Sequence, residues 1–213
     1  TDADSSGNII VSQYNRDGVK KFLYDTASTD SGFGNKGVSG KGNSKYEGNS
    51  NCRTSYSYSG ETYDGIYYTT AYYERAVVAI RASDGRCLQR YNLGFYPYNM
   101  TIDQSTGYLY VGGNRGYKTI NLRNGSMSNC SYNTNQAYAY GSAISGNRIV
   151  YSRQNYLYVH SLSGSGSRCP GTSGNQISYR AGYYVGLKFN PNNNTELWTL
   201  SWTASRMQKL TFN

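Results

Sequence analysis

Short runs of alternating apolar and polar residues recur along the chain, and turn-forming residues separate them. Within residues 96–125 the runs occupy residues 100–102, 108–111 and 117–122. Asp103 to Gly107 and Gly112 to Gly116 supply the turns between them. Because side chains alternate between the two faces of a strand, such runs indicate short strands. Three strands joined by tight turns predict an antiparallel meander.

The same pattern recurs in five copies. Residues 1–11 match residues 101–111 without a gap, and the other copies occupy residues 65–85, 146–164 and 194–213. A spacing of roughly forty residues is typical of blade repeats. We therefore expect an all-β chain that forms a five-bladed β-propeller of meander blades, a single domain over residues 1–213. The expected blades cover about residues 1–50, 51–95, 96–137, 138–180 and 181–213, and a β-sandwich with regular turns is the alternative.

The first and last blades of this prediction are incomplete. Thr1 falls midway through the innermost strand of the first blade, and Asn213 follows the third strand of the last. Flanking sequence, a loosely closed ring, or a strand donated by a neighbouring molecule would each account for this. Strand donation would produce self-assembly, because a donated strand makes a contact that need not close.

Residues 30–51 interrupt the pattern, because they are rich in glycine and lysine and contain almost no apolar residue. This composition predicts a mobile surface loop or a ragged outer strand, with a binding loop as the alternative.

The amino-acid composition supports the all-β prediction and limits the classes of binding partner that we expect. The 213 residues include 25 Tyr and 25 Gly, and strands favour tyrosine while turns favour glycine. No apolar run is long enough to predict a transmembrane segment. The net charge of +9 is scattered, whereas a binder of single-stranded nucleic acid needs a continuous basic groove. We therefore expect no nucleic acid partner.

Pairs of tyrosines precede four of the expected inner strands. They are Tyr56 and Tyr58, Tyr96 and Tyr98, Tyr138 and Tyr140, and Tyr183 and Tyr184. Residues two apart on a strand project from the same side, so these pairs could form repeated platforms on which the faces of sugars stack. The alternative is that their rings fill the space between blades.

The cysteines and the glycosylation motifs indicate where the protein is located in or outside the cell. Cys52, Cys87, Cys130 and Cys169 fall in the outer regions of the first four blades, and their spacing does not fit a zinc site. Two disulfides are expected, with three connectivities open. Adjacent outer strands usually lie too far apart for a disulfide, so the cysteines either need loops to bring them together or form bonds between molecules.

Asn-X-Ser/Thr motifs for glycosylation occur at Asn99, Asn124, Asn129 and Asn193. Together these features predict a secreted, extracellular protein.

Catalytic motifs are absent from the sequence, and we expect neither an enzyme nor a bound metal or cofactor. His160, the single histidine, shares a strand face with Tyr158 and Leu162, which favours a packed or edge side chain. The twelve carboxylates lie mostly in turns, where a turn role suffices.

Two resemblances follow from the repeat. The pattern of Asp103 and residues 107–111 resembles blades of the NHL and YVTN propeller class, which implies an interaction scaffold. Residues 65–93 and 196–212 are similar to blades of extracellular five-bladed olfactomedin domains, although the basic, tyrosine-rich composition departs from that family. The resulting hypothesis is lectin-like, multivalent recognition of glycans or glycoproteins. The alternative is a structural, adhesive or filament-forming matrix subunit that assembles through strand donation or intermolecular disulfides.

Overall fold

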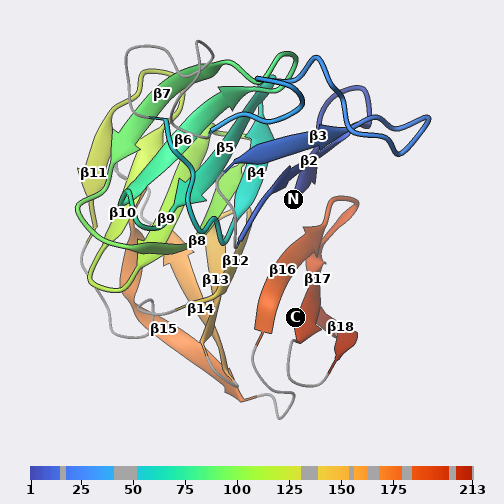
Figure 1. The fold of residues 1–213 in the computed structure, drawn as a ribbon. Coiled ribbons are helices and arrows are strands. Elements are labelled where there is room, and N and C mark those ends of the chain that lie inside the picture. Colours follow the sequence, from blue (N-terminus) through green and yellow to red (C-terminus); the bar gives the residue numbers. More distant parts are fainter. Residues whose placement is uncertain are drawn as a thin grey trace. The chain divides into compact units, whose positions relative to one another are not determined.

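The computed structural model describes residues 1–14, 18–40, 52–130, 139–153, 156–162, 168–178, 184–201 and 205–212. Throughout these ranges the regular structure is β, and five antiparallel sheets follow one another along the chain (Figure 1). The strands of each sheet are hydrogen-bonded in sequence order, which is the meander expected from the repeat. The fold is therefore the predicted five-bladed β-propeller. No helix within the described ranges is long and apolar enough to cross a membrane.

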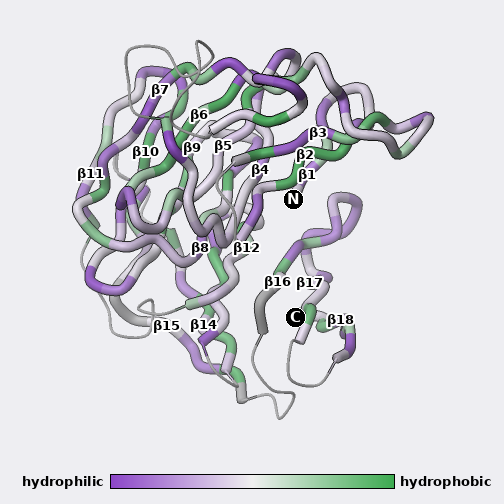
Figure 2. The backbone as a smooth tube through the Cα atoms, in the orientation of Figure 1, coloured by the Kyte–Doolittle hydropathy of each residue, from purple (hydrophilic) through white to green (hydrophobic). Residues whose placement is uncertain are grey.

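The residues form two compact units, of which unit 1 is Thr1–Pro97. Its first sheet contains β1 (Asp2–Ala3), β2 (Ile9–Ser12) and β3 (Val19–Phe22), and its second contains β4 (Gly60–Tyr63), β5 (Ile66–Ala71), β6 (Ala76–Arg81) and β7 (Cys87–Asn92). Figure 2 shows hydrophobic residues concentrated on strands such as β2 and β6.

Unit 2 is Tyr98–Asn213 and holds the other three sheets. The third sheet contains β8 (Pro97–Asp103), β9 (Tyr108–Gly113), β10 (Tyr117–Asn121) and β11 (Met127–Asn129). The fourth contains β12 (Gly141–Ser145), β13 (Arg148–Arg153), β14 (Tyr156–Leu162) and β15 (Pro170–Ser178), and the fifth contains β16 (Tyr184–Asn190), β17 (Asn193–Ser201) and β18 (Arg206–Thr211). The first and last sheets thus have three described strands and the middle sheets four, as expected.

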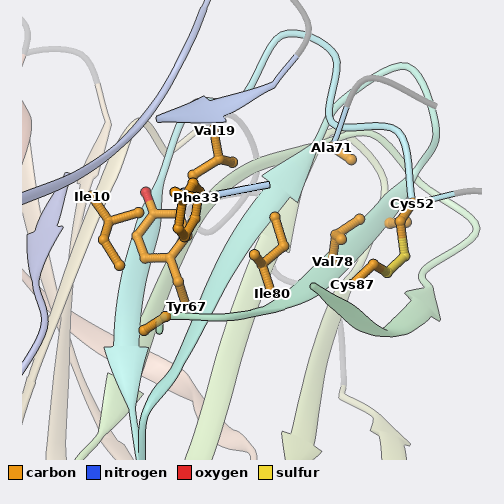
Figure 3. Close-up of a cluster of buried hydrophobic side chains, with 11 residues drawn as sticks. Ile10, Val19, Phe33, Cys52, Tyr67, Ala71, Val78, Ile80 and Cys87 are labelled. Carbon is orange, nitrogen blue, oxygen red and sulfur yellow. A yellow bond between two sulfur atoms is a disulfide. The ribbon is translucent and has the colours of Figure 1, made fainter. Parts of the chain in front are cut away.

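The core of unit 1 lies between its two sheets. Ile10 and Val19 of the first sheet pack against Tyr67 and Ile80 of the second, and all four side chains are fully buried. Figure 3 shows Phe33 beside Tyr67 in this cluster. The apolar face that the alternating pattern predicts for each strand is therefore the face that joins neighbouring blades.

Phe33 also changes the interpretation of the glycine-rich region. Its ring is fully buried, and the chain around it is held by hydrogen bonds from the backbone of Gly34 to Asp84 O and from the Ser39 hydroxyl to Gly85 O. Ser39 also forms a β-bridge with Val19. Residues 30–40 therefore pair with β3 as a ragged outer strand would, which is one of the two forms that the sequence predicts; residues 41–51 lie outside the described ranges.

The cores of unit 2 repeat this arrangement twice. Side chains of the third and fourth sheets form one buried cluster, which includes Tyr110, Tyr117, Ile149, Tyr151 and Leu162. Side chains of the fourth and fifth sheets form another, which includes Val150, Leu157, Leu187, Phe189 and Leu197. Alternate residues of β13 thus serve the two clusters, because successive side chains of a strand point to opposite faces.

The turns before β2 and β9 differ by one residue, although the sequences match without a gap. The carboxylate of Asp4 accepts a hydrogen bond from Ser6 N, and that of Asp103 accepts one from Ser105 N. The turn then closes through Gly7, three residues after Asp4, but through Gly107, four residues after Asp103. The glycines align in sequence, whereas the aspartates that organise the two turns do not.

One disulfide ties the segment before β4 to β7 of the same sheet, and the other ties the segment after β11 of the third sheet to the segment before β15 of the fourth. Cys52 pairs with Cys87 across a Cα separation of 6.3 Å, and Cys130 pairs with Cys169 across 5.4 Å. Of the four, only Cys87 lies in a strand, so the connecting segments bring the pairs within bonding distance. The expected help from loops is confirmed, and no thiol of this structure is left for a bond between molecules.

Candidate binding site

Six tyrosines form a continuous cluster in unit 1, which we call the tyrosine cluster. Its members come from connecting segments: Tyr14 follows β2, Tyr56 and Tyr58 precede β4, Tyr72 and Tyr73 occupy the turn between β5 and β6, and Tyr96 precedes β8. All six lie outside regular strands, so their rings are not committed to the packed faces of the sheets.

The rings of the tyrosine cluster contact one another in a chain. Tyr14 lies 5.1 Å from Tyr58 and 5.4 Å from Tyr56, measured between ring centroids. Tyr56 lies 4.8 Å from Tyr73, and Tyr72 lies 5.2 Å from Tyr73 and 4.8 Å from Tyr96. Most of these contacts are edge-to-face, a favoured arrangement of aromatic pairs.

Hydrogen bonds of side chains and backbone hold the connecting segments of the cluster in place. Ser55 donates from its hydroxyl to both carboxylate oxygens of Glu74, in the β5–β6 turn, and its carbonyl accepts from Tyr72 N at 3.0 Å. The Thr70 hydroxyl accepts from Tyr58 N at 3.0 Å. Tyr56 itself has a φ of 50°, a left-handed conformation that is uncommon for a bulky residue. The segment before β4 is therefore fastened to the turn that carries Tyr72 and Tyr73.

Solvent reaches this cluster, and a cation borders it. Tyr14 is 50% exposed and Tyr73 is 58% exposed, while the other four rings are half-buried. The exposed Arg75 places its guanidinium 4.5 Å from the Tyr96 ring centroid and donates to the Tyr96 hydroxyl at 2.8 Å. The site thus combines accessible aromatic surface, phenolic hydroxyls and a positive charge, which are groups that bind sugar faces and their hydroxyls.

The structure brings together only part of the predicted tyrosine set. Tyr56, Tyr58 and Tyr96 belong to the tyrosine cluster of unit 1, whereas Tyr98 and Tyr140 contact each other in unit 2 with centroids 5.7 Å apart. Tyr138 and Tyr183 lie outside the described residues, as does the side chain of Tyr184. The space-filling role falls to other tyrosines in the strands, such as the fully buried Tyr67, Tyr110 and Tyr151.

Sequence reasoning missed Tyr14, Tyr72, Tyr73 and Arg75. The sequence did mark Tyr72, Tyr73 and Arg75 as unusual. They lie in the turn between β5 and β6, which reads AYYERA, whereas turns usually carry glycine, asparagine or aspartate. Two adjacent tyrosines at such a position must leave at least one ring outside the sheet. Tyr14 carried no comparable signal.

A second group of tyrosines, in unit 2, is buried and forms a polar network. Arg168 donates from Nη2 to Asp103 at 3.1 Å and from Nε to the Tyr110 hydroxyl at 3.2 Å. The Tyr151 hydroxyl donates to the Tyr117 hydroxyl. Burial raises the pKa of both phenols well above the ordinary value. Because its polar groups are paired within the core, this network holds the third and fourth sheets together.

The carboxylate of Asp103 stays ionised in this network. Burial alone would raise its pKa, but hydrogen bonds from Ser105 and Thr106 and the charge of Arg168 outweigh burial and lower it. Arg168 immediately precedes Cys169, so the ion pair and the Cys130–Cys169 disulfide hold the same segment.

His160 is packed inside the fourth sheet. Its ring is fully buried, with Nδ1 2.9 Å from the Gly171 carbonyl oxygen and Nε2 without a hydrogen-bond partner. Burial lowers its pKa. Gly174 leaves the room for the ring, since a Cβ there would lie 2.5 Å from it. The packed position fits the interpretation given by the sequence.

The described parts of the chain contain no cluster of three or more His, Cys, Asp or Glu residues that could hold a metal ion.

Among the glycosylation motifs, Asn124, Asn129 and Asn193 are exposed. Asn99 is 1% exposed and donates to the Ala139 carbonyl at 2.6 Å, so its side chain has no room for a glycan in the folded structure.

Comparisons with known proteins support the fold alone. Neither a protein-family profile nor a curated protein sequence matches the chain. The structure is similar to a solved structure of hydrazine synthase from Kuenenia stuttgartiensis, with a TM-score of 0.54 and 11% sequence identity. The similarity covers 69% of this chain and 43% of that chain, so it spans less than half of the other protein. The NHL, YVTN and olfactomedin resemblances remain predictions.

Proposed function

We propose that the chain is an extracellular, non-enzymatic propeller that binds glycans or glycoproteins in the manner of a lectin. The observation that carries this proposal is the tyrosine cluster, with Tyr14 and Tyr73 open to solvent and Arg75 beside Tyr96. The apolar faces of sugar rings stack on aromatic side chains, while hydroxyl and guanidinium groups meet the sugar hydroxyls.

More than one tyrosine group supports a multivalent form of this binding. The tyrosine cluster lies in unit 1 and the Tyr98–Tyr140 contact in unit 2. Weak sites on one chain raise avidity when a ligand carries repeated sugars, because the second binding event becomes intramolecular. Two disulfides within the chain are compatible with an extracellular location.

A glycan array followed by calorimetric titration tests the proposal. Tyr73→Ala removes an exposed cluster ring, and Tyr24→Ala is the matched control, because Tyr24 is 74% exposed and lies outside the cluster. We expect Tyr73→Ala to weaken glycan binding about tenfold, or about 1.4 kcal/mol, and Tyr24→Ala to leave it unchanged. A wild-type chain that binds no glycan, or equal losses in both variants, would refute the proposal.

The alternative function is assembly into a matrix or filament, and one surface favours it. The last sheet exposes the apolar side chains of Trp198, Leu200 and Met207. A second copy of the chain is the occupant we propose for this surface, through a donated strand. Sedimentation over a range of concentrations tests it: wild type should associate, and Leu200→Lys should not. A monomer at every concentration would remove this alternative.

A further inference from the structure

Two hydroxyls of the tyrosine cluster meet at the surface. Tyr14 and Tyr58 bring their phenolic oxygens to 3.4 Å, and their rings cross at 75°. Tyr14 follows β2 in the first sheet, and Tyr58 lies 44 residues later, just before the second sheet. The contact therefore joins segments of two different blades at a position that solvent reaches, since Tyr14 is 50% exposed.

We propose that Tyr14 and Tyr58 form a site of oxidative cross-linking, in which a haem peroxidase with hydrogen peroxide couples them to dityrosine. Each phenol loses one electron and one proton to give a phenoxyl radical. The two radicals join through a carbon–carbon bond between ring positions ortho to the hydroxyls, and the ring hydrogens leave as protons while aromaticity returns. In total, two C–H bonds are replaced by one C–C bond, and hydrogen peroxide is reduced to two water molecules.

Geometry selects this pair. Coupling joins the carbons next to the hydroxyls, and in Tyr14 and Tyr58 the hydroxyl-bearing ends of the rings face each other. Tyr117 and Tyr151 also share a hydroxyl contact, but both are buried to 2% exposure or less, so an oxidising enzyme has no access to them. Their raised pKa values make loss of the phenolic proton harder still.

The cross-link would add a covalent tie between the first two blades. The Cys52–Cys87 disulfide already ties the segment between these blades to the second sheet, and a compartment that maintains disulfides is oxidising. A bond across 44 residues restricts the unfolded chain, so it should also raise the midpoint of thermal unfolding. This inference does not depend on glycan binding.

Peroxidase treatment of the full chain, dilute and with limiting hydrogen peroxide, tests the proposal. Trypsin releases Tyr14 in the peptide of residues 1–16, which contains no other tyrosine, and Tyr58 in the peptide of residues 54–75. We expect dityrosine fluorescence in the monomer band and a cross-linked peptide whose fragments locate the bond at Tyr14 and Tyr58.

Single variants provide the controls for this experiment. Tyr14→Phe and Tyr58→Phe should each abolish that cross-linked peptide, while Tyr24→Phe, which changes a more exposed tyrosine outside the cluster, should retain it. Near-ultraviolet and far-ultraviolet circular dichroism would check that each variant is folded. Absence of dityrosine from the wild-type monomer, or a bond at any pair other than Tyr14 and Tyr58, would overturn the proposal.

Discussion

Two groups of tyrosines serve opposite purposes, namely the tyrosine cluster of unit 1 and the buried group of Tyr110, Tyr117 and Tyr151 in unit 2. In unit 1 the tyrosine cluster lies in connecting segments, and its rings contact one another at the surface. In unit 2, Tyr110, Tyr117 and Tyr151 lie on strands, where their rings are buried and their hydroxyls are paired with each other or with Arg168. In these two groups, the tyrosines in connecting segments keep accessible rings, whereas the tyrosines on strands support the core.

A pair of salt bridges shows the same contrast for charged groups. Arg168–Asp103 in unit 2 and Arg81–Asp84 in unit 1 have equal distances of 3.1 Å. Their aspartate side chains differ in exposure, at 10% for Asp103 and 43% for Asp84. Water screens the exposed pair, whereas the buried one has lost its hydration and depends on its partners.

The largest expected effect comes from truncating a buried ring. Tyr151→Ala would leave a cavity beside Tyr117 and remove the donor of its hydroxyl contact. We expect the free energy of unfolding to fall by about 3–5 kcal/mol, measured by urea denaturation. Tyr73→Ala, in the tyrosine cluster, is the control and should cost less than about 1 kcal/mol. Equal losses in the two variants would show that the two groups do not differ in role.

The two aspartates give the next comparison. Asp103→Ala removes the acceptor for Ser105, Thr106 and Arg168, and we expect it to lower the free energy of unfolding by about 2–4 kcal/mol at neutral pH. Asp84→Ala should lower it by about 1 kcal/mol or less, because that ion pair is exposed.

The dependence of this loss on pH provides a second test of Asp103. Its pKa in the folded state lies below the ordinary value of 3.8, so its contribution is present above that pH and is lost as the pH falls through the folded pKa. The difference between wild type and Asp103→Ala should therefore shrink in acid. A constant difference down to strongly acidic pH would contradict the assigned ionisation.

His160 should make unit 2 sensitive to mild acid. Burial lowers its pKa below the ordinary value of 6.5, so the unfolded chain binds a proton at a pH where the folded chain does not. Stability should therefore fall as the pH drops below about 6.5, by at most about 1.4 kcal/mol per pH unit. His160→Gln should flatten the slope between this pH and the folded pKa, whatever its effect at neutral pH. An unchanged slope would show that His160 does not control this transition.

The sequence predicted the repeat much better than it predicted the site. Alternating runs such as those of β9 and β10 locate strands, because burying one face requires a period of two. The same rule could not show that Phe33 enters the core, since its glycine-rich surroundings have no period. That position depends on contacts with Asp84 and Gly85, which are distant in the sequence.

The tyrosine cluster was only partly predictable for a similar reason. Tyr56, Tyr58 and Tyr96 were found because they recur at one place in the repeat, but Tyr56 lies outside a strand with a positive φ, so the rule that residues two apart share a face did not apply. Tyr14 joins the cluster through the packing of one blade against the next. Such contacts between blades are not encoded in the pattern of a single blade.

The smallest expected change in stability comes from comparing the exposed hydroxyl contact of Tyr14 and Tyr58 with the buried one of Tyr117 and Tyr151. Tyr14→Phe removes a hydroxyl that water can replace, so the free energy of unfolding should change by less than about 0.5 kcal/mol. The same substitution at Tyr117 leaves the buried hydroxyl of Tyr151 without its acceptor and should cost about 1–3 kcal/mol. Urea denaturation of both variants measures the difference. If Tyr14→Phe proved as costly as Tyr117→Phe, the surface contact would be a structural part of the fold, and the separation between a binding group of tyrosines and a supporting one would fail.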